Sequence, residues 1–259
     1  MRALLVGLTF LVCTPFFGGA VVVAAMLGLE DRRGSVYDWA PRLWARTLLW
    51  AGGVRLHLHG AERVQRGEAR IYVSNHVSWY DVFALAAVLP HYKWIAKAEL
   101  AKIPIFGRGA RAAGMIFIER DNRKAAFAQY QRAADNMRHG VSVIVCPEGT
   151  RGDSYALRPF KKGPFVLAIA AGAPIVPTIV HGTIDVHPRG SWQVRRGDVH
   201  VHFLDVIPTS GLSYEQRDEL AQLTWNRMAE AMRDLYGVEI TPARRSSPAL
   251  REAGTAGVA

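Results

Sequence analysis

The fold is decided by the stretch Ile71-Tyr72-Val73-Ser74-Asn75-His76-Val77-Ser78-Trp79-Tyr80-Asp81, in which an apolar run leads into polar residues. The apolar run at its start predicts a buried strand, so His76 falls where a strand ends and a helix begins. In α/β sheets, active-site residues collect at such carboxyl ends of strands. The position of His76 therefore predicts a functional site as well as a strand–helix unit.

His76 and Asp81 are five positions apart and form a candidate catalytic pair. A neutral imidazole can take a proton from an alcohol near pH 7. A carboxylate on the other ring nitrogen fixes the tautomer and stabilises the imidazolium that forms. Ser78-x-x-Asp81 also matches a helix capping box, in which both side chains serve only the helix start. These residues alone leave both interpretations open.

Further motifs follow in order along the chain, most of them directly after an apolar run. They are Gly114-Met115-Ile116-Phe117-Ile118-Glu119-Arg120, Cys146-Pro147-Glu148-Gly149-Thr150-Arg151, Phe160-Lys161-Lys162-Gly163 and Ala173-Pro174-Ile175-Val176-Pro177. Together with Asn75-His76-x4-Asp81, this series resembles the glycerolipid acyltransferase family, which includes the lysophosphatidate acyltransferases. The resemblance covers residues 71–180, the central part of the chain.

The resemblance implies acyl transfer from a thioester to a substrate hydroxyl, with His76 as general base and Asp81 orienting it. It implies an acceptor that carries a phosphate, which the planar fork of arginine suits. The residues that it places at the substrates are Arg120, Glu148, Gly149, Thr150, Arg151, Lys161 and Lys162.

Three of these assignments keep alternatives. Glu148 either holds an acceptor hydroxyl or orders its loop. The Gly149 amide is an oxyanion candidate, although a plain turn would also favour glycine there. One of the two lysines, Lys161 or Lys162, binds the acceptor or the 3′-phosphate of coenzyme A, or both are exposed without a role.

The net charge of +10 predicts an acidic partner, either nucleic acid or an anionic membrane. Residues 3–29 are uncharged and long enough to span a bilayer. Pro15, Gly18 and Gly19 leave open a broken helix that dips into one leaflet, and a cleaved signal peptide is a further alternative. Residues 36–52 predict a tryptophan-bearing amphipathic helix, suited to a membrane interface or packed on the domain. This amino terminus favours membrane over nucleic acid.

Strands alternate with helices over the rest of the chain, which predicts an α/β fold with a mostly parallel central sheet flanked by helices. The resemblance implies a glycerolipid acyltransferase-type fold with an N-terminal membrane-associated helical segment. We expect a membrane anchor at 1–33, an amphipathic interfacial helix at 34–53, an acyltransferase domain at 54–240 and a disordered tail at 241–259. Expected strands are 54–59, 71–74, 93–96, 115–118, 141–145, 175–180 and 199–206; expected helices are 79–89, 123–138, 164–171 and 214–236.

The expected function is transfer of a fatty acyl group from acyl-CoA or acyl carrier protein to 1-acylglycerol 3-phosphate, giving phosphatidate for phospholipid biosynthesis. We expect the enzyme at the inner membrane, with its catalytic domain facing the cytoplasm, and with no metal, no other cofactor and no nucleic acid. Alternatives are another acceptor, such as lyso-ornithine lipid, glycerol 3-phosphate or another lysophospholipid, or a non-catalytic basic membrane-binding protein. His57 and His59 share one face of a predicted strand, where either metal ligation or a polar strand face would explain them.

Overall fold

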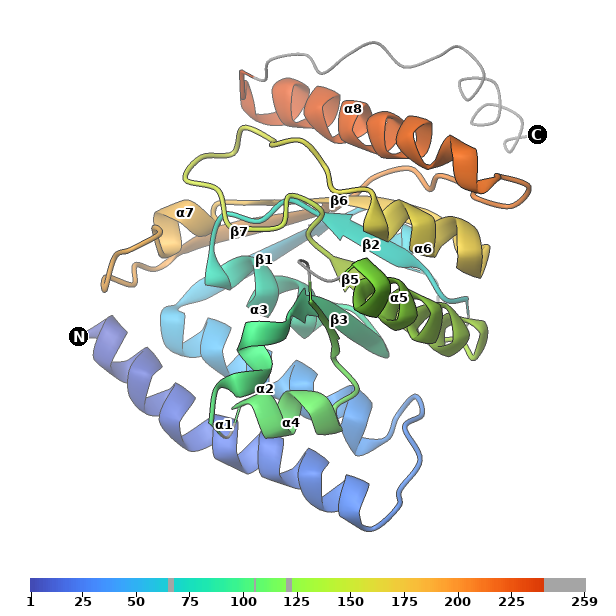
Figure 1. Cartoon of the computed structure of the whole chain (residues 1–259). Coiled ribbons are helices and arrows are strands. Elements are labelled where there is room, and N and C mark those ends of the chain that lie inside the picture. Colours follow the sequence, from blue (N-terminus) through green and yellow to red (C-terminus); the bar gives the residue numbers. More distant parts are fainter. Residues whose placement is uncertain (65–67, 105, 120–122, 240–259) are drawn as a thin grey trace.

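The computed structural model describes residues 1–64, 68–104, 106–119 and 123–239 (Figure 1). Within these ranges the chain forms a seven-stranded sheet with helices on both faces, and two long helices at the amino terminus. The strands are β1 (Val54–His59), β2 (Ile71–Ser74), β3 (Tyr92–Lys97), β4 (Ile116–Ile118), β5 (Ser142–Val145), β6 (Ile175–His181) and β7 (Gly197–Phe203).

Helices precede, connect and follow these strands, and several of them cover the faces of the sheet. They are α1 (Arg2–Met26), α2 (Val36–Gly52), α3 (Trp79–Val88), α4 (Phe106–Ala112), α5 (Arg123–Arg138), α6 (Gly163–Ala171), α7 (Thr183–Val186) and α8 (Arg217–Tyr236). Short 3-10 helices cover Ala61–Arg63, Ala98–Lys102 and Tyr214–Gln216.

The sheet has the strand order β1-β7-β6-β2-β5-β3-β4. β6, β2, β5, β3 and β4 pair in parallel, whereas β7 is antiparallel to β6 and β1 is parallel to β7. The prediction of a mostly parallel sheet is therefore confirmed. The five parallel strands end at the same edge of the sheet, so the loops after them gather there.

Each face of the sheet has its own hydrophobic core. α5, α6 and α8 cover one face, where Phe165, Leu220 and Trp225 are buried. α2 and α3 cover the other face, where Leu48 and Leu85 are buried. Because both faces are covered, every residue of β2 and β5 is buried, as parallel strands in α/β proteins require.

The amino-terminal helices α1 and α2 form a hairpin that packs on the domain. α1 is a single helix despite Pro15 in its middle, so the proline and the two glycines after it do not interrupt it. Trp44 Nε1 on α2 donates a hydrogen bond of 3.0 Å to Thr14 Oγ1 on α1. α1 also contacts α4. α1 is long and apolar enough to cross a membrane.

Two aspartates, Asp31 and the buried Asp38, attach this hairpin to the start of β3. Asp31 forms a 2.5 Å ion pair with Lys93 Nζ and lies 3.2 Å from His91 Nε2. Asp38 accepts the backbone N–H of His91 at 2.9 Å and pairs with Arg42 at 2.5 Å. Burial acts to raise the pKa of each carboxyl, but these donors and cations hold both pKa values below the ordinary value.

The predicted elements and the observed ones differ mainly in short helices. α4 contains two glycines and shows no apolar periodicity, and α7 is a single turn, so neither had a sequence signal. The last predicted strand, 199–206, is observed as Gly197–Phe203. Leu204 still donates its N–H to Pro177 O, but proline has no N–H with which to return the bond, so the ladder stops there. The predicted disordered tail lies outside the described residues.

Candidate active site

Asn75 fixes the position at which β2 ends. Its side-chain amide donates to Val180 O at 2.9 Å, and its carbonyl accepts the Val180 N–H at 2.8 Å. The side chain thus replaces a backbone partner for β6, and it is buried. His76 follows directly and is held at the carboxyl edge of the sheet. The sequence motif had included Asn75 without assigning it a role.

His76 and Asp81 are brought together as predicted, with 3.0 Å between His76 Nδ1 and Asp81 Oδ2. Thr183 Oγ1 donates to the other carboxylate oxygen at 2.5 Å. A carboxylate at this position accepts the Nδ1–H, so in the neutral imidazole the lone pair is on Nε2. Within the described residues nothing hydrogen-bonds Nε2, and the ring is partly exposed, with 17% of its side chain accessible. This is the geometry of a general base.

The same carboxylate also caps α3. Asp81 Oδ2 accepts the backbone N–H groups of Val77 at 2.7 Å and Ser78 at 2.8 Å, and Ser78 Oγ accepts from Tyr80 N at 3.3 Å. The capping box is therefore complete. The two interpretations of the sequence are compatible, because one buried carboxylate orients the imidazole and closes the helix start.

Glu148 joins the His76 loop to the loop that follows β5. Its Oε1 accepts the His76 N–H at 3.0 Å, and its Oε2 accepts from Arg158 N and Nε at 3.3 and 3.4 Å. Gly152 N donates to His76 O at 2.7 Å. Burial raises the pKa of the Glu148 carboxyl despite these donors. The structure thus gives Glu148 a loop-ordering contact, which was one of its two predicted roles.

Gly149 and Thr150 form the turn after Glu148. Gly149 has φ +84° and donates its amide to Cys146 O at 3.2 Å. A side chain at this φ would be strained, which explains the glycine. The amide predicted for an oxyanion therefore serves a turn in this structure. Thr150 is exposed, and its carbonyl accepts from Arg158 Nη2.

Arg151 lies close to the His76–Asp81 pair and stacks on the first residue of α3. Its guanidinium carbon is 4.9 Å from the centre of the Trp79 ring. It forms no ion pair within the part of the chain that the structure describes. Burial and the nearby charge of Arg189 lower the pKa of Arg151, and the Asp81 carboxylate opposes this. Arg151 is thus a cation beside the candidate base, and no carboxylate of the described residues pairs with it.

Arg189 is a site residue that the sequence did not indicate. It donates from Nη1 to Arg151 O at 3.0 Å and pairs with Asp153 at 3.1 Å. Its position depends on the β6–β7 connection, which no sequence motif marks. Arg189 both orders the Arg151 loop and adds positive charge to this end of the site.

The remaining predicted residues are placed less closely around the pair. Lys162 Nζ lies 2.6 Å from Asp218 Oδ2, so its charge is directed towards α8. Lys161 is exposed and its backbone N–H donates to Pro147 O at 2.8 Å. Arg120 lies outside the described residues.

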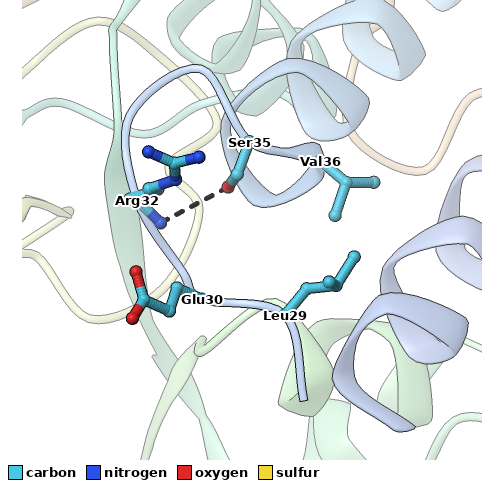
Figure 2. Close-up of a pocket in the computed structure, with 5 residues that line it drawn as sticks. All are labelled: Leu29, Glu30, Arg32, Ser35 and Val36. Carbon is cyan, nitrogen blue, oxygen red and sulfur yellow. Dashed lines mark hydrogen bonds between the residues drawn. The ribbon is translucent and has the colours of Figure 1, made fainter. Parts of the chain in front are cut away.

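A pocket in the α1–α2 loop lies away from this site. Figure 2 shows it between Leu29, Glu30, Arg32, Ser35 and Val36, with Arg32 N donating to Ser35 Oγ at 3.3 Å. This loop is attached to the first residues of β3, at the opposite edge of the sheet from the loop that follows β2. The pocket therefore does not belong to the candidate active site.

Comparison with known proteins decides the family. The sequence profile named Acyltransferase matches residues 55–181. A 1-acyl-sn-glycerol-3-phosphate acyltransferase alpha from Ovis aries is 32% identical over 196 residues, which cover 75% of this chain and 68% of that protein. The chain belongs to the acyltransferase family. The His76–Asp81 pair and the Glu148–Arg151 loop both lie within the matched region.

Two further similarities agree with this membership. A protein named putative 1-acyl-sn-glycerol-3-phosphate acyltransferase acl-2 from Caenorhabditis elegans is 32% identical over 186 residues, 71% of this chain. The match spans only 66% of that relative's length. The crystal structure of PlsC, the 1-acyl-sn-glycerophosphate acyltransferase from Thermotoga maritima, superposes with a TM-score of 0.74 at 24% identity, covering 95% of this chain and 100% of PlsC. This likeness confirms the fold that the sequence resemblance implied.

Proposed function

We propose that this chain is a membrane-associated O-acyltransferase that converts 1-acylglycerol 3-phosphate to phosphatidate. The observation that carries the proposal is the His76–Asp81 pair beside Arg151. Among the described residues, Nε2 of His76 has no hydrogen-bond partner and the Arg151 guanidinium has no ion-pair partner. The His76 base requires a substrate with a hydroxyl group, and the Arg151 guanidinium suits a phosphate. 1-acylglycerol 3-phosphate offers both groups. Relatives named for this activity support the choice of acceptor.

The geometry supports direct transfer without an acyl-enzyme. His76 Nε2 takes the proton of the acceptor hydroxyl as its oxygen attacks the thioester carbonyl. The tetrahedral intermediate then collapses, the carbon–sulfur bond breaks, and the imidazolium returns the proton to the leaving thiolate. Asp81 stabilises the imidazolium in between. Such acid–base catalysis contributes about 10²–10⁴-fold, and orientation of the two substrates adds to it.

Arg151 is our proposed phosphate ligand, with Arg189 adding positive charge from the neighbouring loop. Arg120 and Lys161 stay predictions from the family motifs. Lys162 would have to leave Asp218 before it could bind a substrate, since its ammonium is 2.6 Å from that carboxylate. The donor in this proposal is acyl-CoA or acyl carrier protein.

The α1–α2 hairpin is our proposed membrane-binding element. Large apolar side chains are exposed along it, a pattern that marks a membrane or protein contact. α1 packs against α2 and α4, which favours a hairpin lying in one leaflet over an isolated spanning helix. We place it at the inner membrane with the catalytic domain in the cytoplasm, where both acyl donors occur. The exposed side chains are Leu4, Leu5, Leu8, Phe10, Leu11, Val12, Phe16, Val23, Trp39, Leu43 and Trp50.

A panel of acceptors tests the activity. Purified full-length protein in detergent would receive labelled acyl-CoA or acyl carrier protein with 1-acylglycerol 3-phosphate, lyso-ornithine lipid, glycerol 3-phosphate or lysophosphatidylcholine. We expect labelled phosphatidate from the first acceptor, no product with His76→Ala, and normal product with His139→Ala, which changes an exposed histidine at the end of α5. Transfer to a different acceptor would replace the substrate assignment. Turnover by His76→Ala equal to that of the wild type would remove the proposed base.

A further inference from the structure

We propose that His59, His200 and His202 form a binding site for a divalent transition-metal ion such as Zn²⁺. The three imidazoles lie on the outer strands β1 and β7, and none of them belongs to the loop that follows β2. Each offers one ring nitrogen, and these three atoms lie within 4.8 Å of one another. The proposal is independent of the acyl-transfer reaction.

Strand pairing creates the cluster from two short motifs. Histidines two positions apart on a strand point to the same face, and the chain has this His-x-His pattern at 57–59 and again at 200–202. β1 and β7 pair in parallel with His57 opposite His200 and His59 opposite His202. Four imidazoles therefore share one face of two adjacent strands, and a rigid sheet backbone holds their spacing.

One nitrogen–nitrogen distance already matches a tetrahedral metal site, and the others lie within reach of it. His59 Nε2 and His200 Nδ1 are 3.2 Å apart. Two nitrogens each 2.0–2.1 Å from Zn²⁺ in a tetrahedron are about 3.3 Å apart. A metal would replace the single proton that these two nitrogens share. The rings of His59 and His202 are stacked, with centroids 4.2 Å apart, so they must turn about χ2 to converge; this torsion is broad in histidine.

Neighbouring groups support three ligands rather than four. Tyr236 Oη at the end of α8 is 2.5 Å from His202 Nε2. A metal-bound histidine commonly donates its other N–H to such an oxygen, which leaves Nδ1 of His202 for the metal. His57 is held by Asp198 at 2.7 Å, and Asp198 also pairs with Arg55. Three imidazoles and a water would complete the shell.

The ligand set selects the kind of ion. Imidazole suits Zn²⁺, Cu²⁺ and Ni²⁺, whereas Mg²⁺ and Ca²⁺ prefer oxygen ligands. In the described part of the sheet, β1 pairs only with β7. The metal would add a second link between β1 and β7 and, through Tyr236, would connect both strands to α8. His59 and His200 are 141 positions apart, so the site exists only in the folded chain and binding would stabilise it.

Zinc titration of the tag-free, chelator-treated full chain tests the proposal. Competition with a chromophoric chelator should give one Zn²⁺ per chain, unaffected by excess Mg²⁺. His59→Gln and His200→Ala should each weaken binding by about 10-fold or more and abolish the zinc-dependent rise in melting temperature. His139→Ala is the matched control and should bind as the wild type does.

Three results would overturn the site. The first is an absence of saturable zinc binding by the wild type, and the second is unchanged binding by both ligand variants. The third is loss of the bound zinc in His76→Ala, which would place the metal in the candidate active site instead. The first two would leave the four histidines as a polar strand face. Because His59 is exposed, His59→Gln should fold normally even if His200→Ala does not.

Discussion

The double use of Asp81 gives a test that separates catalysis from helix capping. We consider Asp81→Asn, which keeps the shape and removes the charge. Asp81 Oδ2 accepts His76 Nδ1 and the N–H groups of Val77 and Ser78, whereas Oδ1 accepts Thr183 Oγ1. The two backbone donors therefore require the asparagine carbonyl at the Oδ2 position. In that orientation Nδ1 of His76 still donates and the tautomer is kept, so the main change is loss of charge beside the imidazolium.

Two magnitudes follow from this geometry. A unit charge about 4 Å from the imidazolium contributes about 4 kcal/mol at an effective dielectric constant near 20, so kcat should fall by about 10³-fold. The three hydrogen bonds to the Oδ2 position become neutral, and the Thr183 hydroxyl must accept from the new amide instead of donating. A buried charge is also removed, so the net loss of stability should be about 1–2 kcal/mol. That corresponds to a fall of roughly 3–6 °C in melting temperature.

Ser78→Ala is the matched control, because it removes the other half of the capping box and leaves the carboxylate. It should cost about 1 kcal/mol of stability with kcat changed less than about 10-fold. Single-turnover acyl transfer and thermal unfolding, measured on the same preparations, give both quantities. Asp81→Asn with near-normal turnover and a lower melting temperature would refute the catalytic role and leave only the cap.

Three further predictions concern the phosphate, the hairpin and the membrane. Arg151→Lys keeps the charge but loses the planar fork of the guanidinium, so KM for the lysophospholipid should rise about 10-fold or more with little change in KM for the acyl donor. The control Arg138→Lys should leave both KM values unchanged. Steady-state kinetics with each substrate varied in turn decide this. The pKa of Asp38 is lowered in the folded state. The ionised carboxylate therefore stabilises the fold above the unfolded pKa, and this stabilisation is lost as pH falls through the folded pKa. Below about pH 5, the melting temperature of Asp38→Asn should depend less on pH than that of the wild type. Trp39→Ala should weaken co-sedimentation with anionic vesicles. The control Tyr214→Ala changes an exposed aromatic residue next to α8 and should leave it unchanged. Equal vesicle binding by both variants would show that α2 does not contact the membrane.

The sequence predicted the parts of the site that depend on local order. His76 and Asp81 meet because five residues separate them across a strand end and a helix start. The apolar runs similarly predicted the strands, since buried parallel strands have few polar residues. Local spacing was sufficient wherever one strand–helix unit supplied both partners.

Contacts between distant segments could not be predicted in this way. Thr183 reaches Asp81 across 102 positions, and Asn75 reaches Val180 across 105. Both depend on β6 lying beside β2, which periodicity does not reveal. The same reason applies to Arg189, and to the pairing of β1 with β7 that brings the histidines together.

Glu148 explains why the base and the proposed phosphate ligand keep a fixed relation. One oxygen of its buried carboxylate holds the His76 N–H, and the other holds Arg158, whose guanidinium bonds Thr150 O, immediately before Arg151. Gly152, immediately after Arg151, donates to His76 O. Arg151 is thus flanked on both sides by residues that are bonded, directly or through Glu148, to the backbone of the base. A substrate that places its phosphate on Arg151 would therefore meet His76 at a distance set by the protein, which is the orientation that a direct transfer to a bound hydroxyl requires.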